Sequence, residues 1–385
     1  MTAQVSVPVG PAPRVTGVET YALRVPLNRP IADATWQSPA WIVPVVEITT
    51  EDGFVGTGCS GVHTGHDLIC AAISTYFAPL LVGQPCSEIR GIWERLARSP
   101  IRWVARAGVV HMGQGMVDTA LWDIAAQRAG LPLWQYLGGH HPELHSYNTD
   151  GGWLNWTIDE LIADMAAMVD AGWNRVKMKV GKPDWREDVA RVRAVRSALG
   201  DDITLMCDVN HGWDLMQATR MLPYLEEVGM GWIEEPFHPD DVESHRRLQA
   251  MTRVPVAIGE SLYSLHAFNN FIGADAVRVV QCDVSRVGGV TEWLQIAAAA
   301  ASAGLWVVPH AGDMMQVHQH LVAATFADKP AMIEYIPWTL DVYDYPCEVE
   351  RGMIKLPTVP GASTRVRADA REKWQIPDVG GRLDA

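Results

Sequence analysis

The chain has 385 residues, which suits two domains or one large barrel with an addition rather than one ordinary core. Hydrophobic residues make up 48% and charged residues 20%, as in folded, water-soluble proteins. The formal charge of −14 argues against nucleic acid or an anionic membrane as a partner, because both would repel the surface. A small anionic substrate is compatible with this negative charge if lysines and a cation make the electrostatic potential positive at its binding site.

The cysteines and the first residues indicate a cytoplasmic protein. Six cysteines are scattered without a C-x-x-C pair, which favours reduced thiols over a disulfide framework or a zinc ribbon. Residues 1–15 lack a basic patch followed by an apolar core, so no signal peptide is expected. No uninterrupted apolar run reaches the ~18 residues that a membrane-spanning helix needs.

The first part of the chain predicts an α+β domain over residues 1–140. Strands are expected at 15–25, 42–49 and 54–58, the last two joined by an Asp-Gly turn that is typical of a hairpin. Helical patterns follow at roughly 64–82, 87–98 and 107–130, and Gly130 with Pro132 ends the last one. A run of strands followed by a run of helices indicates an α+β fold.

Residues 141–352 predict a parallel (β/α) barrel. Eight short apolar runs alternate with helical stretches at a spacing of 20 to 30 residues, as a closed barrel requires. An open doubly wound sheet is disfavoured because no Gly-rich fingerprint follows the first strand. Residues 353–385 are expected to pack on the first domain or on the surface. The strands are expected near 144–148, 174–180, 203–209, 230–235, 254–259, 276–282, 305–309 and 332–336.

Acidic residues recur where successive strands end. Asp208, Glu234 and Glu260 stand at equal intervals of 26 residues, one for each strand-helix unit. Because side chains alternate along a strand, Lys177 and Lys179 are expected to share the inner face, and the same alternation places Ile258 with Glu260. The strand ends also carry Asp283, His310 and Glu334. In a barrel these ends form the active face.

Each of these residues also has an ordinary structural explanation. A single acid at a strand end is most often a helix cap or part of a surface ion pair, and a single buried His is usually hydrogen-bonded in the core. Three carboxylates in one cavity are different, because their burial is costly unless a cation or lysines neutralise them. Oxygen ligands without His or Cys favour magnesium or manganese over zinc.

The same residues resemble the enolase superfamily, in its mandelate racemase subgroup. The stretch 116–123, MVDTALWD, followed by GLPL at 130–133 and LGG at 137–139, is similar to that superfamily's passage from cap to barrel. The functional positions of the subgroup match Lys177, Lys179, Asp208, Glu234, Glu260, Asp283 before RVGGV at 286–290, His310 and Glu334. The resemblance covers nearly the whole chain. It implies an α+β cap, a (β/α)7β TIM-like barrel and a C-terminal segment that returns to the cap.

The resemblance also implies abstraction of a proton α to a carboxylate. Mg2+ on Asp208, Glu234 and Glu260 would stabilise the enolate. Lys177 would neutralise a carboxylate oxygen of the substrate, and Glu334, if protonated, would donate a hydrogen bond to it. Lys179 is the expected base on one face, with a pKa lowered by neighbouring cations. His310, oriented by Asp283, is expected on the opposite face as acid or base.

Two reactions can follow from one enolate. Loss of a 3-hydroxyl gives a 2-keto-3-deoxy acid, whereas return of the proton makes a racemase or epimerase. The polar groups expected at the cavity favour a polyhydroxylated sugar acid and hence dehydration, although tryptophans could stack on a phenyl group or on a sugar. Members of the family commonly form dimers or octamers, so a homo-oligomer is expected. The expected substrate-binding residues are Asn148, Asn210, His211, Trp36 and His63.

Two other classes fit the sequence less well. A metal-dependent hydrolase would need His-x-His at the first barrel strand, where the chain has HSYN at 145–148. A non-catalytic binding protein on this fold would typically have lost a base, the histidine or a metal ligand, and none is missing here.

Overall fold

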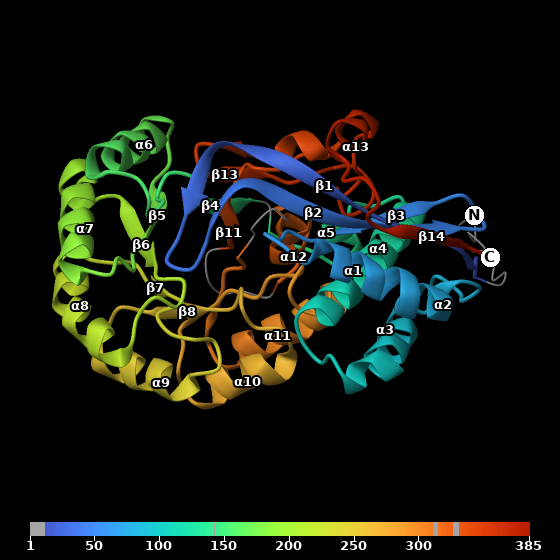
Figure 1. Cartoon of the computed structure of the whole chain (residues 1–385), viewed down its shortest axis with the longest axis horizontal. Helices are drawn as coiled ribbons and strands as arrows, with labels where there is room; N and C mark the ends of the chain where they lie inside the picture. Colours follow the sequence, from blue (N-terminus) through green and yellow to red (C-terminus); the bar gives the residue numbers. More distant parts are fainter. Residues whose placement is uncertain (1–11, 142, 311–314, 326–330) are drawn as a thin grey trace, which may run out of the picture.

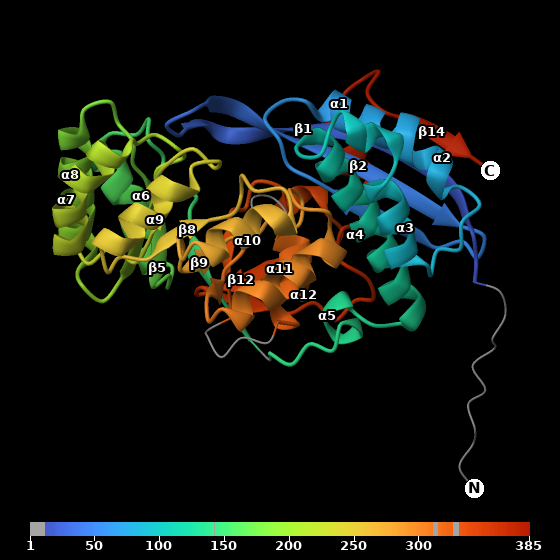
Figure 2. The same cartoon turned by 90° about the horizontal axis from the view of Figure 1, so that it is seen from below.

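The computed structural model describes residues 12–141, 143–310, 315–325 and 331–385. An N-terminal cap and a barrel lie side by side, and a long hairpin of the cap reaches across to the barrel in both views (Figures 1 and 2). Among the described residues, no helix has the length and apolar character needed to cross a membrane. The six cysteines are buried and free, as the sequence predicted.

The cap is built on a four-stranded antiparallel sheet in the order β14-β1-β2-β3. Its strands β1 (Val15–Ala32), β2 (Gln37–Thr50) and β3 (Val55–Cys59) correspond to the three predicted ones, but β1 and β2 extend further and β3 is displaced by one residue. Beyond the predicted strand 15–25, the segment 26–31 continues the hairpin across a register shift between Pro26 and Ile31. Beyond the shift, the hairpin end touches the barrel, since Leu154 N donates to Ala32 O at 2.9 Å.

Helix α4 (Val109–Ala129) joins the cap to the barrel. On its cap side, Asp123 accepts hydrogen bonds from the backbone N–H groups of Thr57 and Ala362. On its barrel side, Asp118 accepts from the backbone N–H and the hydroxyl of Thr291. The helix ends as predicted at Gly130, which has a left-handed φ of 69°.

The other cap helices are α1 (His66–Ala72), the π-helical turn η1 (Ile73–Phe77), α2 (Ala78–Leu81), α3 (Ile89–Ala97), η2 (Pro100–Trp103) and α5 (Leu133–Tyr136).

The barrel follows the predicted alternation of strands and helices. The parallel ladder runs in the order β11-β4-β5-β6-β7-β8-β9-β10. Its strands are β4 (Leu144–Asn148), β5 (Arg175–Lys179), β6 (Thr204–Asp208), β7 (Ile233–Glu234), β8 (Val256–Ile258), β9 (Val279–Val280), β10 (Trp306–Val307) and β11 (Met332–Tyr335). The helices between them are α6 (Ile158–Asp170), α7 (Trp185–Leu199), α8 (Leu215–Glu227), α9 (Val242–Met251), α10 (Leu265–Gly273), α11 (Val290–Ser302) and α12 (Met315–Ala323).

The last part of the chain contains elements that the sequence did not predict. After η3 (Leu340–Val342), strands β12 (Glu348–Glu350) and β13 (Met353–Lys355) form a hairpin, and β13 pairs with the barrel strand β4. Helix α13 (Ala368–Trp374) leads to β14 (Gly381–Asp384), which pairs with β1 at the edge of the cap sheet. The division of the chain at residues 140 and 352 stays a prediction.

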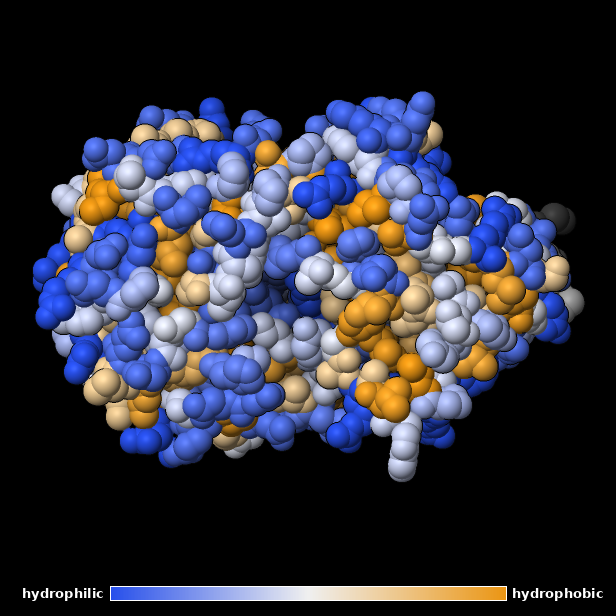
Figure 3. All heavy atoms as spheres, in the orientation of Figure 1, coloured by the Kyte–Doolittle hydropathy of each residue, from blue (hydrophilic) through white to orange (hydrophobic). Residues whose placement is uncertain are grey.

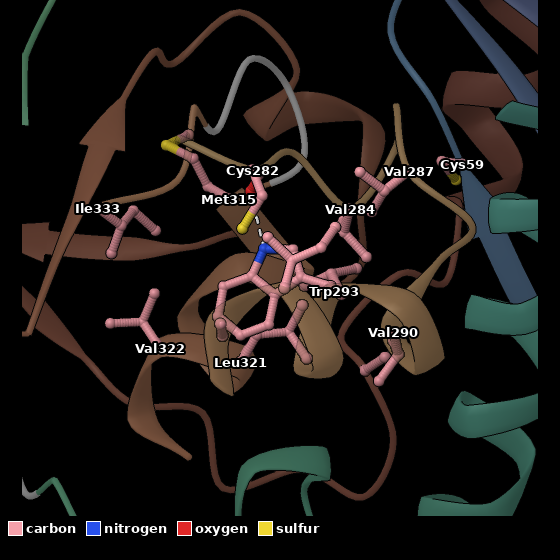
Figure 4. Close-up of a cluster of buried hydrophobic side chains, with 14 of the residues drawn as sticks. Cys59, Cys282, Val284, Val287, Val290, Trp293, Met315, Leu321, Val322 and Ile333 are labelled. Atoms are coloured by element: carbon pink, nitrogen blue, oxygen red, sulfur yellow. Dashed lines mark hydrogen bonds between the residues drawn. The ribbon is translucent and has the colours of Figure 1, made fainter. Parts of the chain in front are cut away.

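Two apolar layers hold the barrel. Outside the strands, Trp293 of α11 packs among residues such as Val284 and Leu321, and its indole N–H donates to Cys282 O at 2.8 Å (Figure 4). Inside the strands, a separate cluster fills the barrel beneath the site. It consists of Tyr147, Met206, Trp232, Ala257, Val279, Val308 and Met332.

Candidate active site

Three carboxylates meet at the carboxyl ends of neighbouring barrel strands. Asp208 ends β6, Glu234 ends β7, and Glu260 follows β8 in the next turn. One oxygen from each lies within 4.8 Å of the others. The prediction that Ile258 shares the inner face with Glu260 was wrong, because Ile258 packs outward against α10 and Ala257 points inward. Strand β8 ends at Ile258, so the alternation does not continue to Glu260.

Two buried lysines of β5 contact these acids. Lys177 Nζ lies 2.5 Å from Glu234 Oε1, 2.7 Å from Glu334 Oε1 and 3.7 Å from Asp208 Oδ2. Lys179 Nζ lies 2.5 Å from Asp208 Oδ2. The strand alternation that the sequence predicted places both ammonium groups inside, while Met178 between them packs outward.

The charges of this cluster perturb its pKa values strongly. Burial, the largest single effect, would lower the pKa of Lys179, but Asp208 together with Glu260 and Asp33 raises it above its ordinary value. Lys177 acts in the expected direction and lowers it. Burial raises the pKa of Glu234 to about 7 against the opposing effect of Lys177. A divalent cation on Asp208 would compete with Lys179 for that carboxylate and so lower the pKa of Lys179.

A histidine–carboxylate pair stands on the other side of the three acids. His310 Nδ1 donates to Asp283 Oδ2 at 2.7 Å, which leaves Nε2 3.1 Å from Glu260 Oε2. Burial lowers the pKa of His310, but Glu260, Glu334 and Asp283 together raise it to about 10. Lys179 comes from β5 and His310 follows β10, so the two groups approach the acids from opposite sides of the ladder.

Glu334 lies in a strongly charged environment. Burial raises its pKa, but Lys177, His310 and the hydrogen bonds to the carboxylate together lower it to about 2. The sequence did not single out Thr149, whose hydroxyl donates to Glu334 Oε1 at 2.8 Å. Thr149 follows β4, which pairs with β11, the strand of Glu334. Such a contact between residues 185 positions apart leaves no local signal in the sequence.

The predicted substrate-binding residues fall into two groups. Asn148 ends β4, and Asn210 and His211 follow β6, where Asn210 N donates to Asp208 Oδ1 at 3.0 Å. Trp36 and His63 belong instead to the cap and stack with ring centroids 3.2 Å apart. Burial lowers the pKa of His63 to about 3, and Lys179 and His310 add to that effect. His63 therefore lies within electrostatic reach of both expected proton-transfer groups.

A wall of aromatic rings continues from Trp36 and His63 to the lysines. Trp41 lies 4.5 Å from His63 and 4.8 Å from Trp338, and Trp338 lies 5.4 Å from Trp153. Lys179 Nζ stands 5.3 Å from the Trp153 ring centre. The mouth is thus less polar than the sequence predicted, although Figure 3 shows a hollow between cap and barrel that is hydrophilic in its depth.

A further acid, Glu235, lies behind the three ligand candidates. It is fully buried, and His211 Nε2 lies 2.9 Å from its Oε2 and 3.2 Å from Ser261 Oγ. The φ angles of Asn210, His211 and Glu235 are 44°, 64° and 41°, which are strained for residues other than glycine. Glu235 stands outside the three-acid group.

The donor set fits a hard divalent cation. Three carboxylates converge with no His or Cys among them, which suits magnesium or manganese. Asp208 and Glu234 are also almost completely buried, so their charges need positive partners, which Lys177 and Lys179 supply here and which a bound cation would supply in addition.

Comparison with known proteins identifies the family. Residues 16–138 match the N-terminal domain of the mandelate racemase/muconate lactonizing enzymes, and residues 160–370 match the enolase C-terminal domain-like family. The chain belongs to the enolase superfamily, in its mandelate racemase subgroup. It is 34% identical to L-talarate/galactarate dehydratase of Salmonella typhimurium over 94% of this chain and 92% of that protein. Arabinonate dehydratase of Saccharolobus solfataricus is 28% identical over 86% of this chain and 90% of its own length.

Solved structures of enolase-superfamily enzymes have the same fold. The Salmonella dehydratase with Mg and L-lyxarohydroxamate superposes with a TM-score of 0.91 at 31% identity, over 100% of this chain and 98% of that one. L-Talarate dehydratase from Polaromonas sp. JS666 with Mg and L-glucarate gives 0.87 at 32% identity, over 97% and 100%. The (β/α)7β barrel with an α+β cap is therefore confirmed.

Proposed function

We propose that this enolase-superfamily protein is a magnesium-dependent hydro-lyase that dehydrates a sugar acid to a 2-keto-3-deoxy acid. The observation that carries the proposal is the two-sided placement of proton-transfer groups, with Lys179 at Asp208 and the His310–Asp283 pair at Glu260. The similarity to L-talarate/galactarate dehydratase supports dehydration, and the Mg present in its structures supports the choice of cation.

Asp208, Glu234 and Glu260 would hold the cation, which when bound neutralises charge that develops on the substrate carboxylate. Lys177 sits among carboxylates at the base of this site and would add a second positive charge there. Thr149 and Lys177 both contact Glu334 Oε1 and would hold this carboxyl group in position.

Lys179, as the neutral amine, would take the proton from the carbon next to the carboxylate. The electron pair of the broken C–H bond then forms the enolate. His310, held by Asp283 with Nε2 facing the cavity, would donate its proton to the departing 3-hydroxyl as the C3–O bond breaks. Water leaves, and the resulting enol tautomerises to the 2-keto acid.

A panel of aldonic and aldaric acids, assayed for 2-keto product in Mg2+ buffer, tests the proposal. We expect Lys179→Ala to abolish product formation and exchange of the α-proton with deuterated water. His310→Asn is expected to abolish product but to retain exchange, because Lys179 remains. His238→Asn, at an exposed histidine, serves as the control.

Two results would overturn the proposal. Full activity of Lys179→Ala would show that Lys179 is not the base. A product that differs from its substrate only in configuration would show that the enzyme is a racemase or epimerase. Assembly into dimers or octamers also remains a proposal, which light scattering after gel filtration can test.

A further inference from the structure

Glu234 differs from the other two candidate metal ligands in how its carboxylate is held. Trp232 Nε1 donates to Glu234 Oε2 at 3.0 Å, and Gln281 Nε2 donates to the same oxygen at 2.7 Å. In the described part of the chain, Asp208 and Glu260 have no comparable pair of uncharged side-chain donors. Asp208 is instead contacted by lysines and one backbone N–H, and Glu260 by His310.

Both donors belong to the interior of the barrel. Trp232 precedes Glu234 by two residues on the same strand face, and its ring packs edge-on against Tyr147 with centroids 5.1 Å apart. Gln281 follows β9 and is 1% exposed. The NH2 group of its amide is a donor and can face an ionised carboxylate, whereas the amide oxygen is an acceptor and cannot do so favourably. Packing from several strands therefore fixes the two N–H groups beneath Glu234.

We propose that Trp232 and Gln281 are positioning residues that occupy Glu234 Oε2 and leave Oε1 as the single oxygen that this residue offers a metal ion. Uncharged donors suit this task, because they orient the carboxylate without placing another positive charge beside the cation. Lys177, which contacts Oε1, is the group that a metal ion would displace or share. The inference rests on the three-acid metal site of the proposed function.

One-oxygen ligation has a consequence for metal choice. Mg2+ requires a compact octahedral set of ligands, whereas Ca2+ is larger and accepts carboxylates through both oxygens. When Oε2 is held, Glu234 cannot turn to present both oxygens. Removal of the two donors would free that rotation, so binding of Mg2+ should weaken more than binding of Ca2+.

The test compares Trp232→Phe, Gln281→Met and the double variant with the wild type. Met is an apolar residue close in volume to Gln, and Phe keeps an aromatic ring although it is smaller than Trp; both lack the N–H group. Trp122→Phe is the matched control, because Trp122 Nε1 donates to Thr291 Oγ1 at 2.9 Å in the cap–barrel interface, away from the site. Binding of Mn2+ is measured by the loss of its free EPR signal, and Mg2+ and Ca2+ are measured by competition.

We expect each single variant to bind Mn2+ and Mg2+ roughly 10-fold more weakly or worse, as is usual for groups that support metal ligands. The loss for Ca2+ should be smaller, so the affinity ratio shifts toward Ca2+, while Trp122→Phe binds like the wild type. The inference is overturned if the variants bind Mg2+ as tightly as the wild type. It is also overturned if the affinities for Mg2+ and Ca2+ fall equally and the melting temperature falls with them. If the wild type itself binds no Mn2+, the proposed function fails instead.

Discussion

Replacement of Lys177 by Met isolates the electrostatics at the centre of the site. The ammonium group is 1% exposed and contacts Glu234, Glu334 and Asp208. Against burial, Lys177 and His310 lower the pKa of Glu334 from 4.5 to about 2. A net difference of about 2.5 pKa units corresponds to roughly 3 kcal/mol. This figure is the balance of several effects and not the share of Lys177 alone, because burial opposes the lowering and His310 contributes to it.

Lys177→Met is therefore expected to lower the free energy of unfolding by about 3–5 kcal/mol near pH 8, the usual effect of removing one partner of a buried ion pair. The sign of the pH dependence follows from Glu334. Its lowered pKa stabilises the wild type above pH 4.5, and this stabilisation is lost as the pH falls toward 2. In the variant, burial raises the pKa values of Glu234 and Glu334. Protonation then relieves the buried charge as the pH falls from 8 to 5.

Urea unfolding followed by tryptophan fluorescence, in buffers with EDTA at pH 5, 6, 7 and 8, measures this difference. We expect the difference in the free energy of unfolding between wild type and variant to decrease steadily toward pH 5. Lys355→Met removes an exposed lysine paired with Glu348 and should leave stability unchanged at every pH. A difference in the free energy of unfolding that stays constant from pH 5 to pH 8, or that is absent, would refute the electrostatic reasoning.

Three other changes test the fold and the site. Burial lowers the pKa of His320 to about 3, and its Nδ1 accepts from Trp134 N. The free energy of unfolding should therefore fall by up to about 1.4 kcal/mol per pH unit below pH 6.5. Urea unfolding of His320→Gln should show a weaker dependence of this free energy on pH. Addition of Mg2+ at 100 times its dissociation constant should stabilise the protein by about 2.7 kcal/mol, seen as a higher melting temperature that EDTA reverses; no change would count against the metal site. Gly58→Ala would bring its Cβ to 1.9 Å from Met116 O in α4 and should lower the melting temperature sharply, whereas Gly273→Ala meets nothing within 4 Å and should not.

The sequence predicted best where the information is local. Lys177 and Lys179 stand two apart on one strand, so alternation alone placed them together inside the barrel. The same rule failed at Glu260, because β8 ends two residues earlier and the turn sets the direction of the side chain. The pKa values of Lys179 and Glu334 depend on partners on other strands, so no local pattern in the sequence specifies them.

By itself, the sequence determined the alternation of strands and helices and the types of residue at the strand ends, because short-range periodicity and repeated spacing encode both. Only the tertiary structure decided which groups touch. Trp338 donates to Asp150 across 188 residues, β14 pairs with β1 at the far end of the chain, and Trp232 and Gln281 meet on one oxygen of Glu234. Such contacts arise when the barrel closes and the cap packs on it, and no local pattern specifies the partner.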